Sequence, residues 1–144
     1  MYNATFSRII NYFIAHNIPP QLAIYIAGQA AFETNDFSSP AFTTDNNCFG
    51  YKYNIQSVHQ SKEKGITSSE GDNYAKYDSI DRSCEELYFY IRRRVQEFEF
   101  PKDYTKVSST LIYAELLKAH SYFGGSIQVY SNGINDKIKL FLNL

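Results

Sequence analysis

Residues 31–52 read AFETNDFSSPAFTTDNNCFGYK, and this stretch decides how the chain is organised. Its first part ends an apolar run with a single carboxylate, Glu33, and a polar loop follows. The compact string NNCFGYK at residues 46–52 closes the stretch. On a helical wheel Glu33 falls within about 60° of Leu22 and Gln29, which places it on the inward-leaning face of a helix. The pattern therefore predicts a partly buried acid where a helical part of the chain meets a polar insert.

The predicted position of Glu33 favours the protonated form of its carboxyl group. The C-terminal end of a helix opposes a negative charge, and apolar neighbours remove the water that would solvate one. Both effects raise the pKa of a carboxyl group, as a general acid working near neutral pH requires. Lysozyme uses this device for glycoside hydrolysis. Taken alone, a glutamate at a helix end also fits a solvated side chain with no chemical role.

Helical periodicity dominates on both sides of this stretch. Apolar stripes predict helices over residues 4–16, 21–33, 79–98, 108–120 and 126–142, and Pro101 is expected to stop the 79–98 helix. The pattern fails over residues 34–78, where short strands are expected at 49–53 and 74–77 and polar loops over 54–73. The expected fold class is α+β, mainly α, built as a single domain over residues 1–144.

Composition describes an ordinary globular chain, with 44% hydrophobic residues, 20% charged residues and a net charge of −1. So small a net charge argues against nucleic acid as the main partner. The basic run at residues 92–94 lies inside a helical pattern and fits a solvated face. No apolar stretch approaches the ~18 residues that a membrane span needs.

The first residues do not form a signal-peptide pattern, because Arg8 and His16 interrupt their apolar part. We therefore expect synthesis in the cytoplasm without a signal peptide. Action outside the cytoplasm would then need another route, such as lysis of the host cell or delivery by a larger particle.

The cysteines and acids suggest no second chemistry. Cys48 and Cys84 define no disulfide framework and are expected to be free thiols. Cys48 with a distant histidine such as His59 is a conceivable thiol-protease pair, but a small packed residue is the favoured interpretation. Asp36 and Asp45 match no hard-cation loop. We expect neither a metal nor a cofactor.

The string QAAFET at residues 29–34, followed after a loop by NNCFGYK at 46–52, resembles the bacterial and phage glucosaminidase family. That family includes the peptidoglycan-cleaving domain of the flagellar rod protein and many autolysins. YAKYDS at residues 74–79 and LLKAHSYF at 116–123 resemble its later motifs, so the resemblance covers about residues 20–142. It implies a lysozyme-like fold, in which a helical lobe and a small β-lobe flank a sugar-binding groove.

The resemblance also implies a hydrolase that cuts peptidoglycan glycan strands at the β-1,4 bond after N-acetylglucosamine. Glu33 matches the family's catalytic acid, and Tyr122 matches a tyrosine that stabilises or positions the reacting sugar. Asn47, Phe49 and Gly50 match the string that begins the β-lobe and walls the groove.

Four tyrosines lie on the expected strands, namely Tyr51, Tyr53, Tyr74 and Tyr77. They are candidates for stacking on sugar faces, Tyr51 and Tyr77 first among them, although half-buried packing explains them equally well.

The family takes a second carboxylate from the β-lobe. Inverting hydrolysis requires the two carboxyl groups to lie ~6.5 to 9.5 Å apart, whereas retaining hydrolysis requires a separation of ~5 Å. Glu70, which precedes a turn predicted at Gly71, is the first candidate, while Glu63 and Asp72 stay open. An acetamido group of the sugar is a further alternative.

Two departures from the family pattern concern the site, namely Asn35-Asp36 after the acid and His120-Ser121 before the tyrosine. A second function therefore stays open, a cell-wall-binding or structural module of a virion or secretion apparatus that keeps the fold with weak or no activity.

Overall fold

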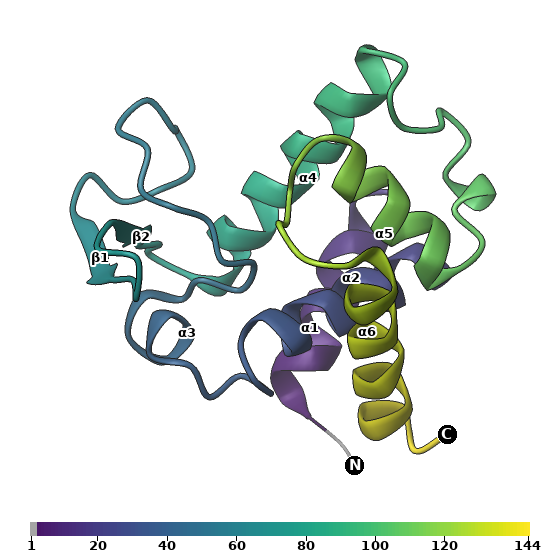
Figure 1. The fold of residues 1–144 in the computed structure, drawn as a ribbon, viewed down its shortest axis with the longest axis horizontal. Helices are drawn as coiled ribbons and strands as arrows, with labels where there is room; N and C mark the ends of the chain where they lie inside the picture. The colour runs from purple at the N-terminus through teal and green to yellow at the C-terminus, as the bar shows by residue number, and fades with distance from the viewer. Residues whose placement is uncertain (1–2) are drawn as a thin grey trace.

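The computed structural model describes residues 3–144 and contains helices with one small antiparallel sheet (Figure 1). This is an α+β fold, mainly α, as the sequence predicts. The elements are, in chain order, α1 (Ala4–Ala15), α2 (Pro20–Glu33), α3 (Pro40–Asp45), β1 (Lys64–Thr67), β2 (Asn73–Ala75), α4 (Ile80–Gln96), the 3-10 helix η1 (Tyr104–Lys106), α5 (Thr110–Ala119) and α6 (Ile127–Leu142).

Helix α2 is the centre of the helical lobe and packs against both α1 and α6 (Figure 1). Two glycines let α2 and α6 approach closely. A Cβ on Gly28 would lie 2.8 Å from Ile138, and a Cβ on Gly133 would lie 2.2 Å from the ring of Phe32. Because such contacts leave no room for a side chain, the last turns of α2, including Glu33, are held against α6.

Serine side chains define where four helices begin. Each accepts a hydrogen bond from the backbone amide three residues further on, which satisfies one of the unpaired donors of a helix start. These caps are Ser39, Ser79, Ser109 and Ser126. The helices after residue 78 thus begin within two residues of the predicted positions. Helix α4 ends at Gln96, earlier than expected, and Phe98 beyond it has a positive φ of 59°.

The β-lobe consists of α3 and a hairpin, at the left of Figure 1. Strands β1 and β2 pair with Lys64 opposite Ala75. The buried carboxylate of Asp45, at the end of α3, accepts the backbone amide of Ile66 at 2.8 Å. Gly65 permits this contact, because a Cβ there would lie 2.6 Å from the same carboxylate oxygen. Asp45 therefore fastens the hairpin to α3, and α4 leads from this lobe to the helical lobe.

Two expectations for the polar insert are wrong. Helix α3 lies within residues 34–78, where no helix was expected, because Ser39 caps a start that already has Pro40 at its first position. The segment 49–53 forms a single bridge, Lys52 with Tyr74, instead of a strand. The partner of β2 is β1, which lies within the expected loop.

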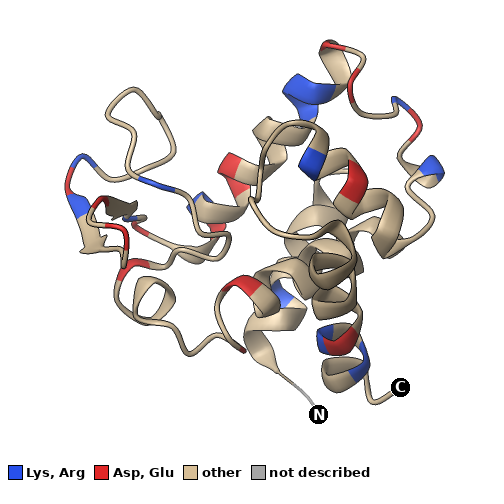
Figure 2. Ribbon diagram, in the orientation of Figure 1, with Lys and Arg blue, Asp and Glu red and all other residues tan. Residues whose placement is uncertain are grey.

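Charged residues of both signs are intermixed along the ribbon of the β-lobe, of α4 and of the C-terminal part of α6 (Figure 2). This distribution agrees with the net charge of −1. Within residues 3–144, no helix has the length and apolar character needed to cross a membrane.

Candidate active site

Glu33 is the last residue of α2 and its side chain is partly buried. The chain then turns sharply through Asn35, Asp36 and Phe37, which have consecutive positive φ values of 50°, 60° and 63°. Asn and Asp adopt this conformation more readily than most other residues. Thr34 Oγ1 accepts the backbone amide of Phe37 at 2.9 Å and so holds the turn. The departure of Asn35-Asp36 from the family pattern thus suits the local backbone.

A chain of hydrogen bonds between buried side chains ends on Glu33. The Tyr113 hydroxyl donates to Gln29 Oε1, and Gln29 Nε2 donates to Tyr130 Oη at 3.2 Å. The Tyr130 hydroxyl then donates to Glu33 Oε1 at 2.6 Å. Because the chain links α5, α2 and α6, the orientation of the Glu33 carboxyl group depends on the packing of the whole helical lobe.

Sequence reasoning did not identify Tyr130 or Tyr113 as parts of the site. Tyr130 lies in the apolar stripe of its helix, and nothing in that stripe distinguishes it from a core aromatic residue. In the structure Phe123 stacks on the Tyr130 ring with centroids 3.9 Å apart, and Phe32 meets the same ring edge-on at 5.5 Å. These two rings hold the hydroxyl of Tyr130 against Glu33. The sequence offered one sign of this hydrogen-bond chain, namely the polar residue Gln29 on the same helix face as Glu33.

Burial raises the pKa of Glu33 above that of an exposed glutamate, and the hydrogen bond from Tyr130 lowers it in part. The direction agrees with the sequence prediction. The position at the C-terminal end of α2 acts in the same direction as burial. The group therefore keeps its proton to higher pH than an ordinary carboxyl group, which suits a general acid.

A cavity of about 320 Å³ opens at the Glu33 carboxyl group, between the end of α2 and the β-lobe. Gly50 forms part of its wall with a positive φ of 74°, and a Cβ there would lie 3.3 Å from Glu33 Oε2. The cavity brings together five residues that the sequence proposed for the site: Glu33, Asn47, Gly50, Glu70 and Tyr74. The other lining residues are Ser39, Pro40, Ala41, Lys52 and Ile66.

Asn47 organises the backbone of this wall. Its Oδ1 accepts the amide of Gly50 at 3.0 Å, and its Nδ2 donates to the carbonyls of Tyr51 at 2.9 Å and Ala75 at 3.0 Å. They add to two backbone hydrogen bonds between this segment and β2, in which the amide of Ala75 donates to the carbonyl of Tyr51 and the amide of Tyr53 donates to the carbonyl of Asn73, each at 2.9 Å. Asn47 thereby fixes where Gly50 approaches the acid.

Among the three candidate second carboxylates, Glu70 lines the Glu33 cavity. It is exposed in the loop between β1 and β2. Asp72 is also exposed, and its carboxylate accepts hydrogen bonds from Ser68 and Lys52, which lower its pKa. Glu63 lies 3.7 Å from Lys76 in an exposed ion pair outside this lining. The arrangement favours Glu70 over its two competitors.

The other predicted site residues do not line the Glu33 cavity. Tyr122 donates its hydroxyl hydrogen to the carbonyl of Phe49 at 3.1 Å, and its ring meets Tyr51 edge-on at 5.7 Å. Phe49 and Tyr77 are buried, and the Tyr77 hydroxyl donates to Glu86. The burial of Phe49 and Tyr77 keeps both rings away from a ligand in this cavity, so they act as supports of its wall. Tyr51 and Tyr53 line a second cavity.

Cys48 and Cys84 are both free and buried, as expected of packed thiols. A hydrogen bond with Cys48, together with burial, raises the pKa of Cys84. Among the residues that the structure describes, no three His, Cys, Asp or Glu side chains are grouped as a metal site would require.

Comparison with known proteins gives two positive findings and one negative one. The sequence model of the glucosaminidase family, described as mannosyl-glycoprotein endo-beta-N-acetylglucosaminidase, matches residues 9–141. A search of curated proteins found no match. A solved structure, a type VI secretion system effector-immunity complex from Pseudomonas protegens, contains a similar chain with a TM-score of 0.63 and 16% identity. The similarity covers 99% of this chain and 96% of that chain.

At 16% identity the structural similarity concerns the fold alone, and it agrees with the predicted lysozyme-like arrangement of a helical lobe and a small β-lobe. The family match carries the assignment, because it spans nearly the whole chain and includes the helix that ends at Glu33. The chain therefore belongs to the glucosaminidase family, whose members are glycoside hydrolases.

Proposed function

We propose that the protein hydrolyses the β-1,4 glycosidic bond that follows N-acetylglucosamine in the glycan strands of peptidoglycan, with Glu33 as the general acid. The observation that carries the proposal is the partly buried Glu33 carboxyl group, whose pKa is raised, on a cavity that also holds Glu70. Membership of the glucosaminidase family supports glycoside hydrolysis. The motifs at residues 29–34 and 46–52 support peptidoglycan as the substrate class.

In this mechanism Glu33 gives its proton to the glycosidic oxygen as the bond from that oxygen to the anomeric carbon breaks. The leaving sugar departs as an alcohol, and positive charge develops on the ring that stays behind. Glu33 becomes a carboxylate in the same step. The Tyr130 hydroxyl, 2.6 Å from Oε1, then donates to an anion and stabilises it.

Glu70 is the group we propose for the second carboxylate role. In an inverting reaction it takes a proton from the water that attacks the anomeric carbon, and in a retaining reaction it attacks that carbon itself. Its place in the hairpin loop, on the cavity that Glu33 also lines, supports this proposal, and the separation of the two carboxyl groups would decide between the two roles. If Glu70 has neither role, the acetamido group of the substrate is the remaining internal nucleophile.

Asn47 and Tyr122 are proposed as positioning residues of the same reaction. Both bind the backbone of residues 49–50, Asn47 through the Gly50 amide and Tyr122 through the Phe49 carbonyl. This backbone passes beside the Glu33 carboxyl group. Loss of either side chain would therefore move the wall against which the sugar rests.

Product analysis on purified peptidoglycan tests the proposal. The wild-type protein should release fragments that carry N-acetylglucosamine at the new reducing end, identified by mass spectrometry after borohydride reduction. Fragments ending in N-acetylmuramic acid would contradict the proposed bond. A wild-type protein that pulls down cell wall but releases nothing would support the alternative of a binding or structural module. A glycoprotein with a chitobiose core is the comparison substrate for the same assay, because the family model is described as a mannosyl-glycoprotein endo-beta-N-acetylglucosaminidase.

We propose that the chain works as one catalytic domain and reaches the wall after host lysis, on a virion, or through a secretion apparatus. The similarity to a chain from a type VI secretion system effector-immunity complex is the reason for proposing a secretion apparatus as one of these routes. Recovery of the protein from cell-free virions or from secreted fractions would separate these routes.

A further inference from the structure

A second cavity, of about 490 Å³, adjoins the Glu33 cavity. Lys52 lines both cavities, and Tyr51 in the second follows Gly50 in the first. The segment 50–52 therefore forms part of the wall of both cavities, and a ligand long enough to pass over it would reach both. The second cavity lies between the segment 51–54, the loop that carries His59, and α4. Its lining residues are Tyr51, Lys52, Tyr53, Asn54, His59, Gln60, Glu86, Phe89, Tyr90 and Arg93.

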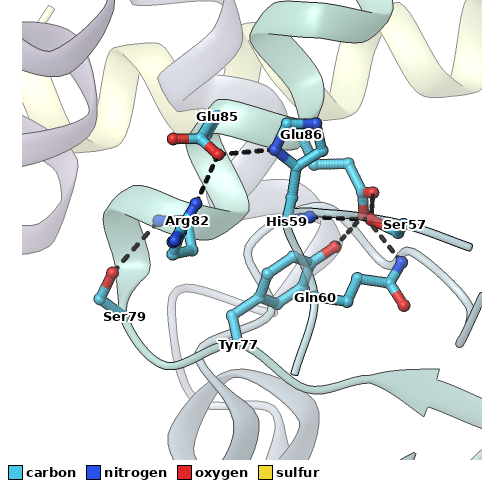
Figure 3. A network of polar contacts seen from close by, with 8 residues as sticks. All are labelled: Ser57, His59, Gln60, Tyr77, Ser79, Arg82, Glu85 and Glu86. Carbon is cyan, nitrogen blue, oxygen red and sulfur yellow. Dashed lines mark hydrogen bonds and ion pairs between the residues drawn. The ribbon is translucent and has the colours of Figure 1, made fainter. Parts of the chain in front are cut away.

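Hydrogen bonds between the loop and α4 hold the walls of this second cavity in place (Figure 3). Glu86 of α4 accepts from Ser57 Oγ at 2.5 Å, from Gln60 Nε2 at 2.9 Å and from the Tyr77 hydroxyl. His59 Nδ1 lies 2.6 Å from Glu85 Oε1. Because Glu86 is held by three donors on the loop and on the segment after β2, its carboxyl group is fixed in place as part of this wall.

The three arginines of the run at 92–94 have different surroundings. Arg94 lies 3.3 Å from Glu97 in an ion pair, and Arg92 lies 5.8 Å from the centre of the Tyr88 ring. Arg93 is exposed on the second cavity, and within residues 3–144 no acidic partner approaches it to ion-pair distance. Arg92 and Arg93 are both exposed, as the interpretation of this run as a solvated face predicts, and Arg93 is the member of the run that lines the second cavity.

The surroundings of Arg93 suit a carboxylate attached to an organic group. A guanidinium offers parallel N–H donors that match the two oxygens of a carboxylate. Phe89 beside it is 48% exposed and offers an apolar face, and the Tyr90 hydroxyl is buried without a hydrogen-bond partner among the described residues. Lys52, the other cation of the lining, already lies 3.2 Å from Asp72.

We propose that this second cavity binds the acidic peptide that peptidoglycan carries on alternate sugars, with Arg93 holding one of its carboxylates. The proposal rests on the proposed function, since it assumes a glycan strand in the Glu33 cavity. The shared wall at Lys52 then lets a sugar beside the acid send its peptide substituent toward Arg93. The protein would thereby prefer strands that still carry their peptides.

The test compares two forms of one substrate, solubilised glycan strands with their peptides and the same strands after an amidase has removed them. Arg93→Gln should lower the ratio of kcat/KM on peptide-bearing strands to kcat/KM on bare strands by about tenfold, the effect of one charge-assisted hydrogen bond. Arg92→Gln is the matched control, because it removes the same charge from the same helix and does not line this cavity. It should leave the ratio at the wild-type value.

Equal ratios for wild type and Arg93→Gln would overturn the proposal, and so would equal losses in the Arg92 and Arg93 variants. If the wild-type protein cuts neither substrate, the proposed function fails, and the cavity is tested by binding alone. Titration with the free peptide, followed by the amide resonances of residues 89–93, should then give shifts in wild type that Arg93→Gln loses. Absence of those shifts in the wild-type protein would overturn the site.

Discussion

The Tyr130 hydroxyl donates a hydrogen bond to Glu33 Oε1 across 2.6 Å and so ties α6 to the last residue of α2. The contact has opposing consequences for the acid. The packing that brings Tyr130 there also buries Glu33 and raises its pKa, while the hydrogen bond itself favours the anion and lowers the pKa in part. Burial thus favours the protonated acid before the reaction, and the hydrogen bond from Tyr130 stabilises the carboxylate that the reaction leaves.

Tyr130→Phe should raise the pKa of Glu33 further, because it removes the hydrogen bond that favours the carboxylate. Activity that needs a protonated acid falls as pH rises through that pKa, so the alkaline limb of log kcat/KM against pH should move to higher pH. The variant should also lose about 1 kcal/mol of stability, since Gln29 Nε2 loses its acceptor. Tyr25→Phe is the control, because its hydroxyl binds the Ser108 carbonyl away from both cavities. An alkaline limb that stays in place or moves to lower pH would contradict the assignment.

Glu33→Gln should stabilise the protein more at pH 7 than at pH 4. The pKa of Glu33 is higher in the folded protein than in the unfolded chain, so the unfolded chain releases its proton first as pH rises. The wild-type protein therefore loses stability as pH rises from the unfolded-state pKa to the higher folded-state pKa, and the Gln variant does not. Urea unfolding of both proteins at the two pH values measures the difference. A difference that is constant, or larger at pH 4, would show that the carboxyl group is not destabilised by burial.

Gly50→Ala should impair both stability and activity. A non-glycine residue at a φ of 74° costs about 1 to 2 kcal/mol, and its methyl group would lie 3.3 Å from Glu33 Oε2. We expect that loss of unfolding free energy in urea, together with a reduced kcat. Gly124→Ala is the matched control, since a Cβ there meets nothing within 4 Å and its φ is not in the left-handed region. Wild-type activity in Gly50→Ala would mean that this wall does not confine the substrate.

Glu70→Gln should lower kcat on the order of 10²-fold without a loss of stability, because Glu70 is exposed yet lines the Glu33 cavity. Glu63→Gln and Asp72→Asn are the controls, and both should keep most of the activity. If one of those two is the impaired variant, the second carboxylate is assigned to the wrong residue. If all three are active, the substrate's own acetamido group becomes the favoured nucleophile.

The sequence predicted the helices well because their signals are local. Apolar stripes with serine caps place α4, α5 and α6 within two residues of their observed starts. The position of Glu33 followed from the same periodicity, since a helical wheel needs only the spacing of Leu22, Gln29 and Glu33.

The β-lobe was predicted less well because its order comes from side chains that bind distant backbone groups. Asp45 binds the amide of Ile66, and Asn47 binds the carbonyl of Ala75, and neither contact leaves a periodic trace in the sequence. The same limit applies to Tyr130, which lies 97 positions from Glu33 along the chain. Tyr77 looked like a groove residue for a related reason, since alternation on a strand does not tell which face is covered.

The most direct test of the central claim is the rate at which Glu33→Gln hydrolyses purified peptidoglycan, followed by the appearance of reducing ends. Removal of a general acid should lower kcat/KM by at least about 10²-fold. The circular dichroism spectrum should stay unchanged, because the Gln side chain still accepts the hydrogen bond from Tyr130. Glu63→Gln, which removes an exposed carboxylate outside the cavity, should keep the wild-type rate. A folded Glu33→Gln variant that releases reducing ends as fast as the wild-type protein would contradict the account.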